Sequence, residues 1–203
     1  MAEDLLLEVG TEELPASFVV PALEDLTRGL GEQLGAARLA HGALHASGTP
    51  RRLAVLAESV AERSPDVRRE VLGPPVKAAF AADGTPTRAA VKFAEGQGRT
   101  VRELRRVQTP RGEYLAADVE ERGQPASELL PEALSRVVHA LAFRKSMRWG
   151  DVEQAFARPV QWLVALHGSE VVPFVFADVR SGRETRGHRF LAPEPLPLAH
   201  ARD

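Results

Sequence analysis

The spacing of apolar residues predicts three main helices. In residues 15–39 and again in residues 125–141, apolar side chains recur every three or four positions, so they share one helical face. A shorter helix is expected at residues 85–95, where a threonine–proline pair precedes the pattern and two glycines follow it. Proline is tolerated in a first helical turn, because the N–H group that it lacks would have no intrahelical partner there.

Shorter apolar runs bounded by glycine and proline predict strands. The predicted strands are residues 5–9, 41–46, 52–59, 69–72, 105–108, 113–119, 160–166 and 171–176. Gly10 and Thr11 should end the first strand, and the Gly-Pro-Pro run at residues 73–75 should end the fourth. The last four strands are expected to form two hairpins. Strands and helices do not alternate regularly, so we predict an α+β fold with a mixed or antiparallel sheet, two or more hairpins and three main helices.

We assign residues 1–192 to one α+β region, and leave open a division into two subdomains near residues 60–85. Residues 180–190 are rich in glycine and arginine and are expected to form a loop. Residues 193–203 are rich in proline, and we expect a truncated tail without a packed element.

Composition narrows the classes of function. There are no cysteines among the 203 residues, which excludes disulfides, thiolate metal sites and cysteine nucleophiles. We find no run of about 18 apolar residues that would predict a membrane span. The N-terminus is acidic and lacks the basic start of a secretory signal. We therefore expect a cytoplasmic protein without a membrane partner.

The basic residues are mostly arginine. Only Lys77, Lys92 and Lys145 of the 26 basic residues are lysines, which leaves 23 arginines (26 − 3), and the net charge is −2. Biased genome composition or a warm habitat would explain this, but so would use of the planar guanidinium to bind phosphate. Three basic clusters are candidate contact sites, with residues Arg51, Arg52, Arg148, Trp149, Arg186, His188 and Arg189. The alternative is that these clusters are solvated or ion-paired to the 28 acidic residues.

Sequence motifs for catalysis are missing. We find no phosphate-binding glycine loop, nucleophile turn or zinc-binding helix motif, and the six histidines lack metal-ligand spacing. Glu12 and Glu13 would be an acid–base pair only if they faced the same way, which adjacent residues do not do. We therefore predict no catalytic residue and no metal site, and interpret both carboxylates as charges near a helix start.

Several motifs, in this order, resemble one protein family. They are LLLEVGTEELP at residues 5–15, TPRRLAV at 49–55, MRWG at 147–150, RPVQWLVAL at 158–166 and TRGHRF at 185–190. GPP at 73–75, the AAVKFA segment and GEYL at 112–115 fit the same pattern. Over essentially its whole length, the chain resembles the N-terminal part of the β subunit of bacterial heterotetrameric glycyl-tRNA synthetase (glycine–tRNA ligase).

The resemblance implies a division of labour between subunits. In that family the α subunit binds ATP, with magnesium, and forms glycyl-adenylate, whereas the β subunit supplies most recognition of tRNA(Gly). The implied partners are the α subunit, tRNA(Gly) and the remainder of the β subunit. The implied role is tRNA binding and subunit assembly for ATP-dependent glycylation, without a cofactor or catalysis in this chain.

Two alternatives remain open from the residues themselves. The chain would otherwise be a structural interaction module that touches no RNA, or a degenerate relic of the subunit. The basic motif residues would either contact tRNA or the α subunit, or hold loops by ion pairs within the chain. Glu8, Glu12 and Glu13 are the expected structural anchors for such arginine loops.

Overall fold

The computed structural model describes residues 1–203, which form two compact units. The larger unit contains Met1–Pro65 and Gln124–Asp203, and the smaller unit contains Asp66–Gly123. The smaller unit is therefore an insertion in the sequence of the larger one. The sequence suggested a division within residues 60–85, but gave no sign of the return at residues 123–124.

A seven-stranded mixed sheet forms the larger unit. Its strands are β1 (Glu3–Thr11), β2 (Leu44–Thr49), β3 (Arg52–Val60), β7 (Val160–His167), β8 (Glu170–Val171), β9 (Val175–Phe176) and β10 (Val179–Gly182). The order is β2-β3-β1-β7-β10-β9, and β8 pairs with β7. Only β10 and β7 pair in parallel. The central strand β1 lies antiparallel to β3 and β7, which places the first motif in the middle of the sheet.

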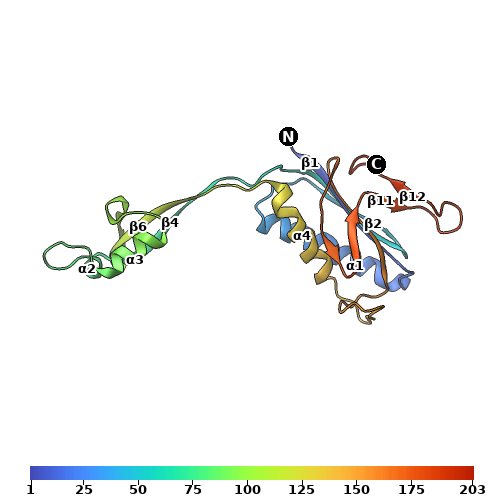
Figure 1. Cartoon of the computed structure of the whole chain (residues 1–203), viewed down its shortest axis with the longest axis horizontal. Helices are drawn as coiled ribbons and strands as arrows, with labels where there is room; N and C mark the ends of the chain where they lie inside the picture. Colours follow the sequence, from blue (N-terminus) through green and yellow to red (C-terminus); the bar gives the residue numbers. More distant parts are fainter. The chain divides into compact units, whose positions relative to one another are not determined.

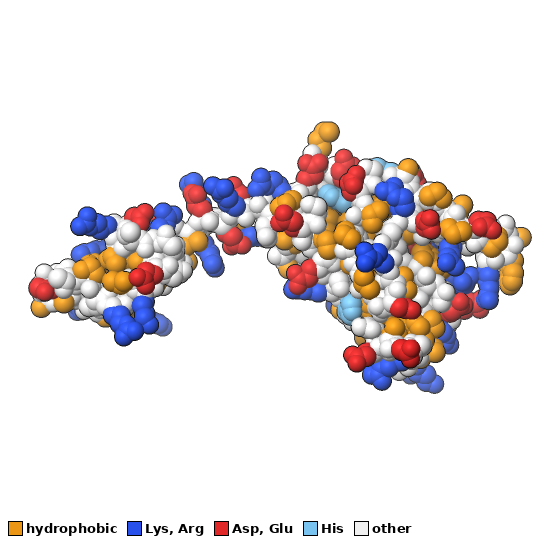
Figure 2. Space-filling model, in the orientation of Figure 1, with side chains coloured by type: hydrophobic (Ala, Val, Ile, Leu, Met, Phe, Trp, Pro, Cys, Tyr) orange, Lys and Arg blue, Asp and Glu red, His pale blue; other side chains and the backbone are white.

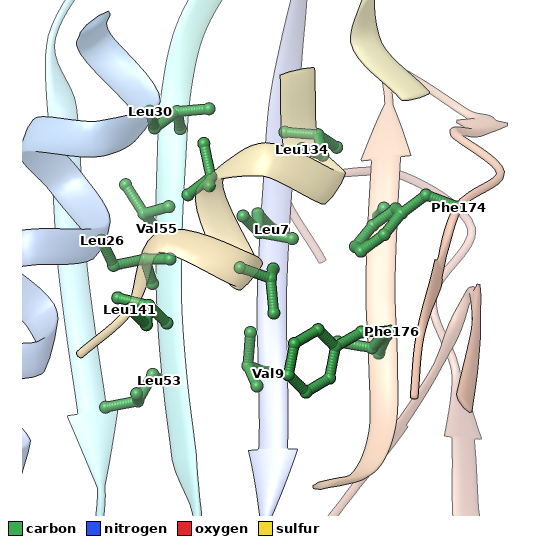
Figure 3. Packing of buried hydrophobic residues seen from close by; sticks show 14 of the residues in the cluster. Leu7, Val9, Leu26, Leu30, Leu53, Val55, Leu134, Leu141, Phe174 and Phe176 are labelled. Atoms are coloured by element: carbon green, nitrogen blue, oxygen red, sulfur yellow. The ribbon is translucent and has the colours of Figure 1, made fainter. Parts of the chain in front are cut away.

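Two helices cover one face of this sheet, α1 (Ala16–Ala36) and α4 (Ala126–Ala140) (Figure 1). Strand side chains alternate between faces, so Leu5, Leu7 and Val9 point toward the helices and are fully buried. Figure 3 shows Leu7 and Val9 among leucines of α1 and α4 and the rings of Phe174 and Phe176. This apolar layer is the main core.

The opposite face of the sheet carries the C-terminal segment. Strands β11 (Glu184–Arg186) and β12 (Pro195–Pro197) form a hairpin, and Ala201 is buried against Trp162, Val164 and Leu166 of β7. The Arg202 guanidinium also pairs with Asp4 of β1. The expectation of a tail without a packed element is therefore wrong, because these residues cover apolar positions of the second face.

The smaller unit is a three-stranded antiparallel sheet with short helices. Its elements are β4 (Val67–Pro75), α2 (Val76–Ala79), α3 (Arg88–Gly96), a 3₁₀ turn (Val101–Glu103), β5 (Arg105–Thr109) and β6 (Gly112–Glu121). The strand order is β4-β6-β5. Ala79, Ala90 and Leu115 form its small core. Both predicted hairpin strands, β5 and β6, are confirmed.

The α+β class is confirmed, and so are the three main helices, with ends shifted by a few residues. Two predicted strand ends are wrong. Gly10 lies inside β1, and β4 continues through the Gly-Pro-Pro run. Both glycines lie inside a strand and leave space for an aromatic ring that packs against them. A Cβ added at Gly10 would lie 2.0 Å from the Trp162 ring, and one added at Gly73 would lie 2.4 Å from the Phe93 ring.

The region that was predicted as one loop, residues 180–190, is partly extended. It contains the end of β10, which pairs with β7, and all of β11, which pairs with β12. The second strand of the last predicted hairpin is also shorter than expected, because β8 ends at Val171 and β9 pairs with β10 instead. No helix is long and apolar enough to cross a membrane.

Candidate functional site

A buried carboxylate on the second face of the sheet joins several strands. Glu8 of β1 is 5% exposed, and its Oε1 accepts hydrogen bonds from Trp162 Nε1 and Thr185 Oγ1, both at 2.5 Å. Its Oε2 lies 3.3 Å from Arg52 Nε in an ion pair. Buried charge is costly unless it is paired and hydrogen-bonded, and here three donors surround it. We call Glu8, Arg52, Trp162, Thr185 and Arg186 the Glu8 cluster.

Arginine side chains hold the β11 hairpin against this cluster. The Arg52 guanidinium donates to the backbone carbonyl of Arg186, and the Arg186 guanidinium lies over the Trp162 ring, 5.6 Å from its centroid. The Trp162 ring itself packs over Gly10, opposite it in the β1–β7 register. The first motif therefore supplies both a carboxylate and a gap for the indole ring.

Beside the Glu8 cluster lies a cavity of about 530 Å³, which we call the arginine pocket. It lies between the β2–β3 turn and the loop that joins β11 to β12, with Trp162 also in its wall. Its lining residues are Glu13, Thr49, Pro50, Arg51, Arg52, Trp162, Gly187, His188, Arg189 and Phe190. The volume falls in the range of small-ligand sites, roughly 300–1,000 Å³.

The loop at the pocket is held by hydrogen bonds to His188. The backbone N–H groups of Phe190 and Leu191 donate to His188 Nδ1 at 3.3 Å each, and Ala192 N–H donates to the His188 carbonyl at 2.8 Å. A Cβ on Gly187 would lie 2.8 Å from Ala192, so only glycine fits this close approach. The loop presents the Phe190 side chain at 80% exposure.

Charge in the pocket is only partly balanced. Glu13 and Arg189 form a long ion pair of 3.7 Å, and Arg52 is paired with Glu8. Arg51 has no carboxylate partner, and its Nε is buried without a hydrogen-bond acceptor. The terminal nitrogens of this guanidinium are suited to an acidic ligand oxygen. Figure 2 shows that elsewhere on the visible face the basic and acidic side chains are interspersed.

The structure brings most of the sequence-predicted contact residues together. Arg51, Arg52, His188 and Arg189 line the arginine pocket, and Arg186 lines an adjoining hollow of about 440 Å³ that shares Trp162. The remaining two candidates lie apart from the pocket lining. Arg148 Nε donates to the Glu153 carbonyl at 2.8 Å, and Trp149 is half-buried against the main core.

The three expected anchors differ in what their carboxylates contact. Glu8 holds the cluster, and Glu13 meets Arg189 at the pocket. Glu12 contributes its backbone N–H, which donates to the Pro159 carbonyl at 3.0 Å, whereas its carboxylate makes no ion pair. An anchoring role for the arginine loops thus has a geometric basis at Glu8 and Glu13 only, and it stays a prediction until it is tested.

Sequence reasoning missed Trp162, Thr185 and Phe190. Trp162 was quoted within a motif, but its pairing with Gly10 is visible only once β1 and β7 are in register. The only available signal was a large aromatic residue in one strand and a glycine in another. No group of three or more His, Cys, Asp or Glu residues is arranged to hold a metal ion.

Comparison with known proteins assigns the chain to one family. The family model described as glycyl-tRNA synthetase beta subunit matches residues 5–203. The chain therefore belongs to the glycyl-tRNA synthetase beta subunit family. It is 59% identical over 198 residues to the glycine–tRNA ligase beta subunit of Myxococcus xanthus, which covers 98% of this chain and 28% of that protein.

Two further relatives carry the same name. The glycine–tRNA ligase beta subunit of Moorella thermoacetica is 48% identical over 203 residues, and that of Syntrophus aciditrophicus is 44% identical over 203 residues. These matches cover 99% and 100% of this chain and 29% of each relative. The chain thus spans less than a third of the length of the relatives that it matches.

Proposed function

We propose that this chain contributes tRNA binding and subunit assembly to a glycine–tRNA ligase, as part of its β subunit. ATP-dependent glycylation of tRNA(Gly), with ATP and magnesium, takes place at the α subunit. The remainder of the β subunit and the α subunit are its protein partners, and the assembly works in the cytoplasm. Family membership supports the assignment to the ligase, and the arginine pocket supports the contact with RNA.

The observation that carries the RNA proposal is the unpaired Arg51 guanidinium beside Arg52, His188 and Arg189. Guanidinium groups on loops are well suited to phosphate, because the planar fork matches two phosphate oxygens. These residues come from two loops that a single sheet face holds in place. A rigid basic pocket positions an RNA backbone without reading its sequence.

A binding titration tests this proposal. Fluorescence anisotropy with labelled tRNA(Gly), at salt concentrations from about 50 to 300 mM, should show an affinity that falls steeply with salt, because phosphate contacts release counterions. The double variant Arg51→Gln/Arg189→Gln should bind more weakly and with a shallower salt slope. The single variants Arg51→Gln and Arg111→Gln make the matched comparison, because each removes one charge and Arg111 lies in the turn of the smaller unit, away from the pocket. Absent or salt-insensitive binding by a folded chain would refute RNA contact.

A structural interaction module without RNA contact is the second candidate. It is favoured by arginines whose charge is already satisfied within the chain, such as Arg105 with Glu70 and Asp118, and Arg136 with Glu132. Co-elution with the α subunit in size-exclusion chromatography, combined with no measurable tRNA binding, would select this function. Co-elution and tRNA binding together would support the first proposal in full.

A further inference from the structure

The arginine pocket brings three kinds of group together in one cavity. Arg51 offers unpaired guanidinium donors, Phe190 offers an exposed aromatic ring, and Glu13 offers carboxylate oxygens. A nucleotide presents the matching set: an anionic phosphate, a flat base and hydrogen-bond donors on the edge of the base. We propose that the arginine pocket binds a single unstacked nucleotide, an inference that rests on the proposed contact with tRNA.

The phosphate end of the site is at the β2–β3 turn. Arg52 is ion-paired with Glu8 and donates to the Arg186 carbonyl, so its charge is already engaged within the chain, although its Nε, like that of Arg51, is buried without a hydrogen-bond acceptor. Arg51 is the free donor, and its backbone is fixed because its carbonyl accepts from Thr11 N–H at 3.0 Å. A phosphate in the pocket would accept hydrogen bonds from the terminal nitrogens of Arg51, because the Nε is itself buried.

The base end of the site is at the β11–β12 loop. Phe190 is 80% exposed although it is large and apolar, and the loop that displays it is held by three hydrogen bonds to His188. Arg189 lies 5.6 Å from the centroid of the Phe190 ring, so one side of the ring is already covered by a cation. A base stacked on an exposed ring gains apolar contact whatever its identity.

Glu13 distinguishes a nucleotide from an acidic peptide. Its ion pair with Arg189 is long, at 3.7 Å, and its side chain is 67% exposed, which leaves lone pairs for a second donor. An acidic peptide side chain brings only acceptors and would be repelled by this carboxylate. A base with an exocyclic amino group donates to this carboxylate instead, just as the amino group of cytosine donates to Glu and Asp side chains in other proteins. The site should therefore prefer cytidine or adenosine to uridine monophosphate.

Nuclear magnetic resonance of the whole 203-residue chain tests the proposal with cytidine 5′-monophosphate, uridine 5′-monophosphate and inorganic phosphate. The chain has two tryptophans, so Trp149→Phe assigns the Trp162 indole N–H signal. Cytidine monophosphate should shift this signal and the amides of residues 187–191 in a saturable way, and should bind more tightly than uridine monophosphate or phosphate.

Three variants separate the two ends of the site. Phe190→Ala should weaken nucleotide binding by roughly 10-fold, from lost stacking, and leave phosphate binding unchanged. Phe190→Tyr should restore it. Arg51→Gln should weaken both nucleotide and phosphate, and Arg111→Gln should affect neither. Equal binding of phosphate and nucleotide, with no effect of Phe190→Ala, would overturn the inference, as would tighter binding of an Asp- and Glu-containing tetrapeptide.

The outcomes also separate this inference from the proposed function. If tRNA binds but nucleotides leave Trp162 and residues 187–191 unshifted, the nucleotide site is refuted while tRNA binding stands. If nucleotides occupy the pocket but tRNA does not bind, the site is supported and the RNA function is refuted. With both present, Phe190→Ala should weaken tRNA binding at every salt concentration without changing the salt slope, because stacking releases no counterions.

Discussion

Glu8 concentrates the contacts of three strands on one side chain. Its carboxylate accepts hydrogen bonds from side chains of β7 and β11 and forms an ion pair with Arg52 of β3, and it is buried among them. Removing charge from such a point leaves donors unsatisfied, which costs more than the loss of an exposed ion pair. The neighbouring Glu12 has no such partners, so the two residues make a matched pair for experiment.

Glu8→Gln should lower the free energy of unfolding by about 2 kcal/mol, because Arg52 then lacks its counter-charge and faces the amide NH2 group, while the amide oxygen still accepts from Trp162 and Thr185. Urea unfolding followed by tryptophan fluorescence measures this change. Glu12→Gln should stay within about 0.5 kcal/mol of the parent chain, because Glu12 is only half-buried and its carboxylate makes no ion pair. Equal effects of the two variants would remove the case for Glu8 as the anchor.

Gly10 is needed because it has no side chain, which leaves space for the Trp162 ring, and not because of its backbone conformation. Gly10→Ala would place a Cβ 2.0 Å from the Trp162 ring. The ring must move out of its contact with Glu8, and we expect a loss of about 1–3 kcal/mol from overpacking. Gly35→Ala in α1 is the control, since nothing lies within 4 Å of its added Cβ. That variant should gain about 0.5–1 kcal/mol from helix propensity. Thermal unfolding of both variants decides the matter, and an unchanged Gly10→Ala chain would contradict the packing argument.

At the scale of elements, the sheet of the smaller unit depends on an exposed charge network. Arg105 of β5 bonds to Asp118 of β6 and to Glu70 of β4, so it spans all three strands. The hydrogen bond from Arg105 holds the pKa of Asp118 below its usual value of 3.8, and the guanidinium charge adds to this effect. The network should therefore weaken in acid.

The direction of the pH effect follows from the lowered pKa. The folded state favours the ionised Asp118, so its contribution is complete above pH 3.8 and is lost as the pH falls through the lower folded pKa. Amide hydrogen exchange of β6 should reveal faster opening near pH 3 than near pH 5. Asp118→Asn should open faster at pH 5 and show a smaller change with pH. Identical pH profiles for the two chains would rule out this network as a source of acid sensitivity.

Elements with regular apolar spacing were predictable because local sequence determines them. Helices α1 and α4 and the β5–β6 hairpin lie close to their expected places. The errors occur where tertiary packing decides. Gly73 looked like a strand end but accommodates the Phe93 ring within β4, where the pairing with β6 shifts between Leu72 and Pro75. A glycine that admits a distant ring cannot be told from a turn glycine by sequence alone.

The basic residues of the candidate site could be predicted from the sequence, but the long-range contacts that bring the site together could not. Arginine clusters stand out in a sequence, so Arg51, Arg52 and Arg189 were found. The role of Glu8 depends on Trp162 and Thr185, which lie 154 and 177 residues away along the chain. Such contacts arise from strand register and from the path of the C-terminal segment. Neither is encoded in a local pattern.

At the scale of the whole molecule, the larger unit consists of two separate stretches of sequence. Hydrogen bonds join the end of the first stretch to the start of the second. Ser64 N–H donates to the Gln124 carbonyl at 2.9 Å, and Gln124 N–H donates to Ser64 Oγ at 2.9 Å. Ala126 N–H donates to the Glu62 carbonyl at 2.7 Å. The two chain segments are therefore neighbours within the larger unit, and a very short linker can join them.

Replacing Asp66–Gly123 by two glycines should leave the larger unit folded, because its main core, the Glu8 cluster and the arginine pocket contain no residue of the smaller unit. The shortened chain should unfold cooperatively, and its Trp162 indole N–H signal should keep its position. Inserting the same two glycines between Glu24 and Asp25 of α1 is the control, because that site is inside a helix and should destabilise the unit. Failure of the shortened chain to fold would show that the core needs the smaller unit.

If the shortened chain folds, its tRNA affinity and salt slope can be compared with those of the full chain. An unchanged salt slope would place the phosphate contacts on the larger unit, and a reduced slope would give the smaller unit a share of them.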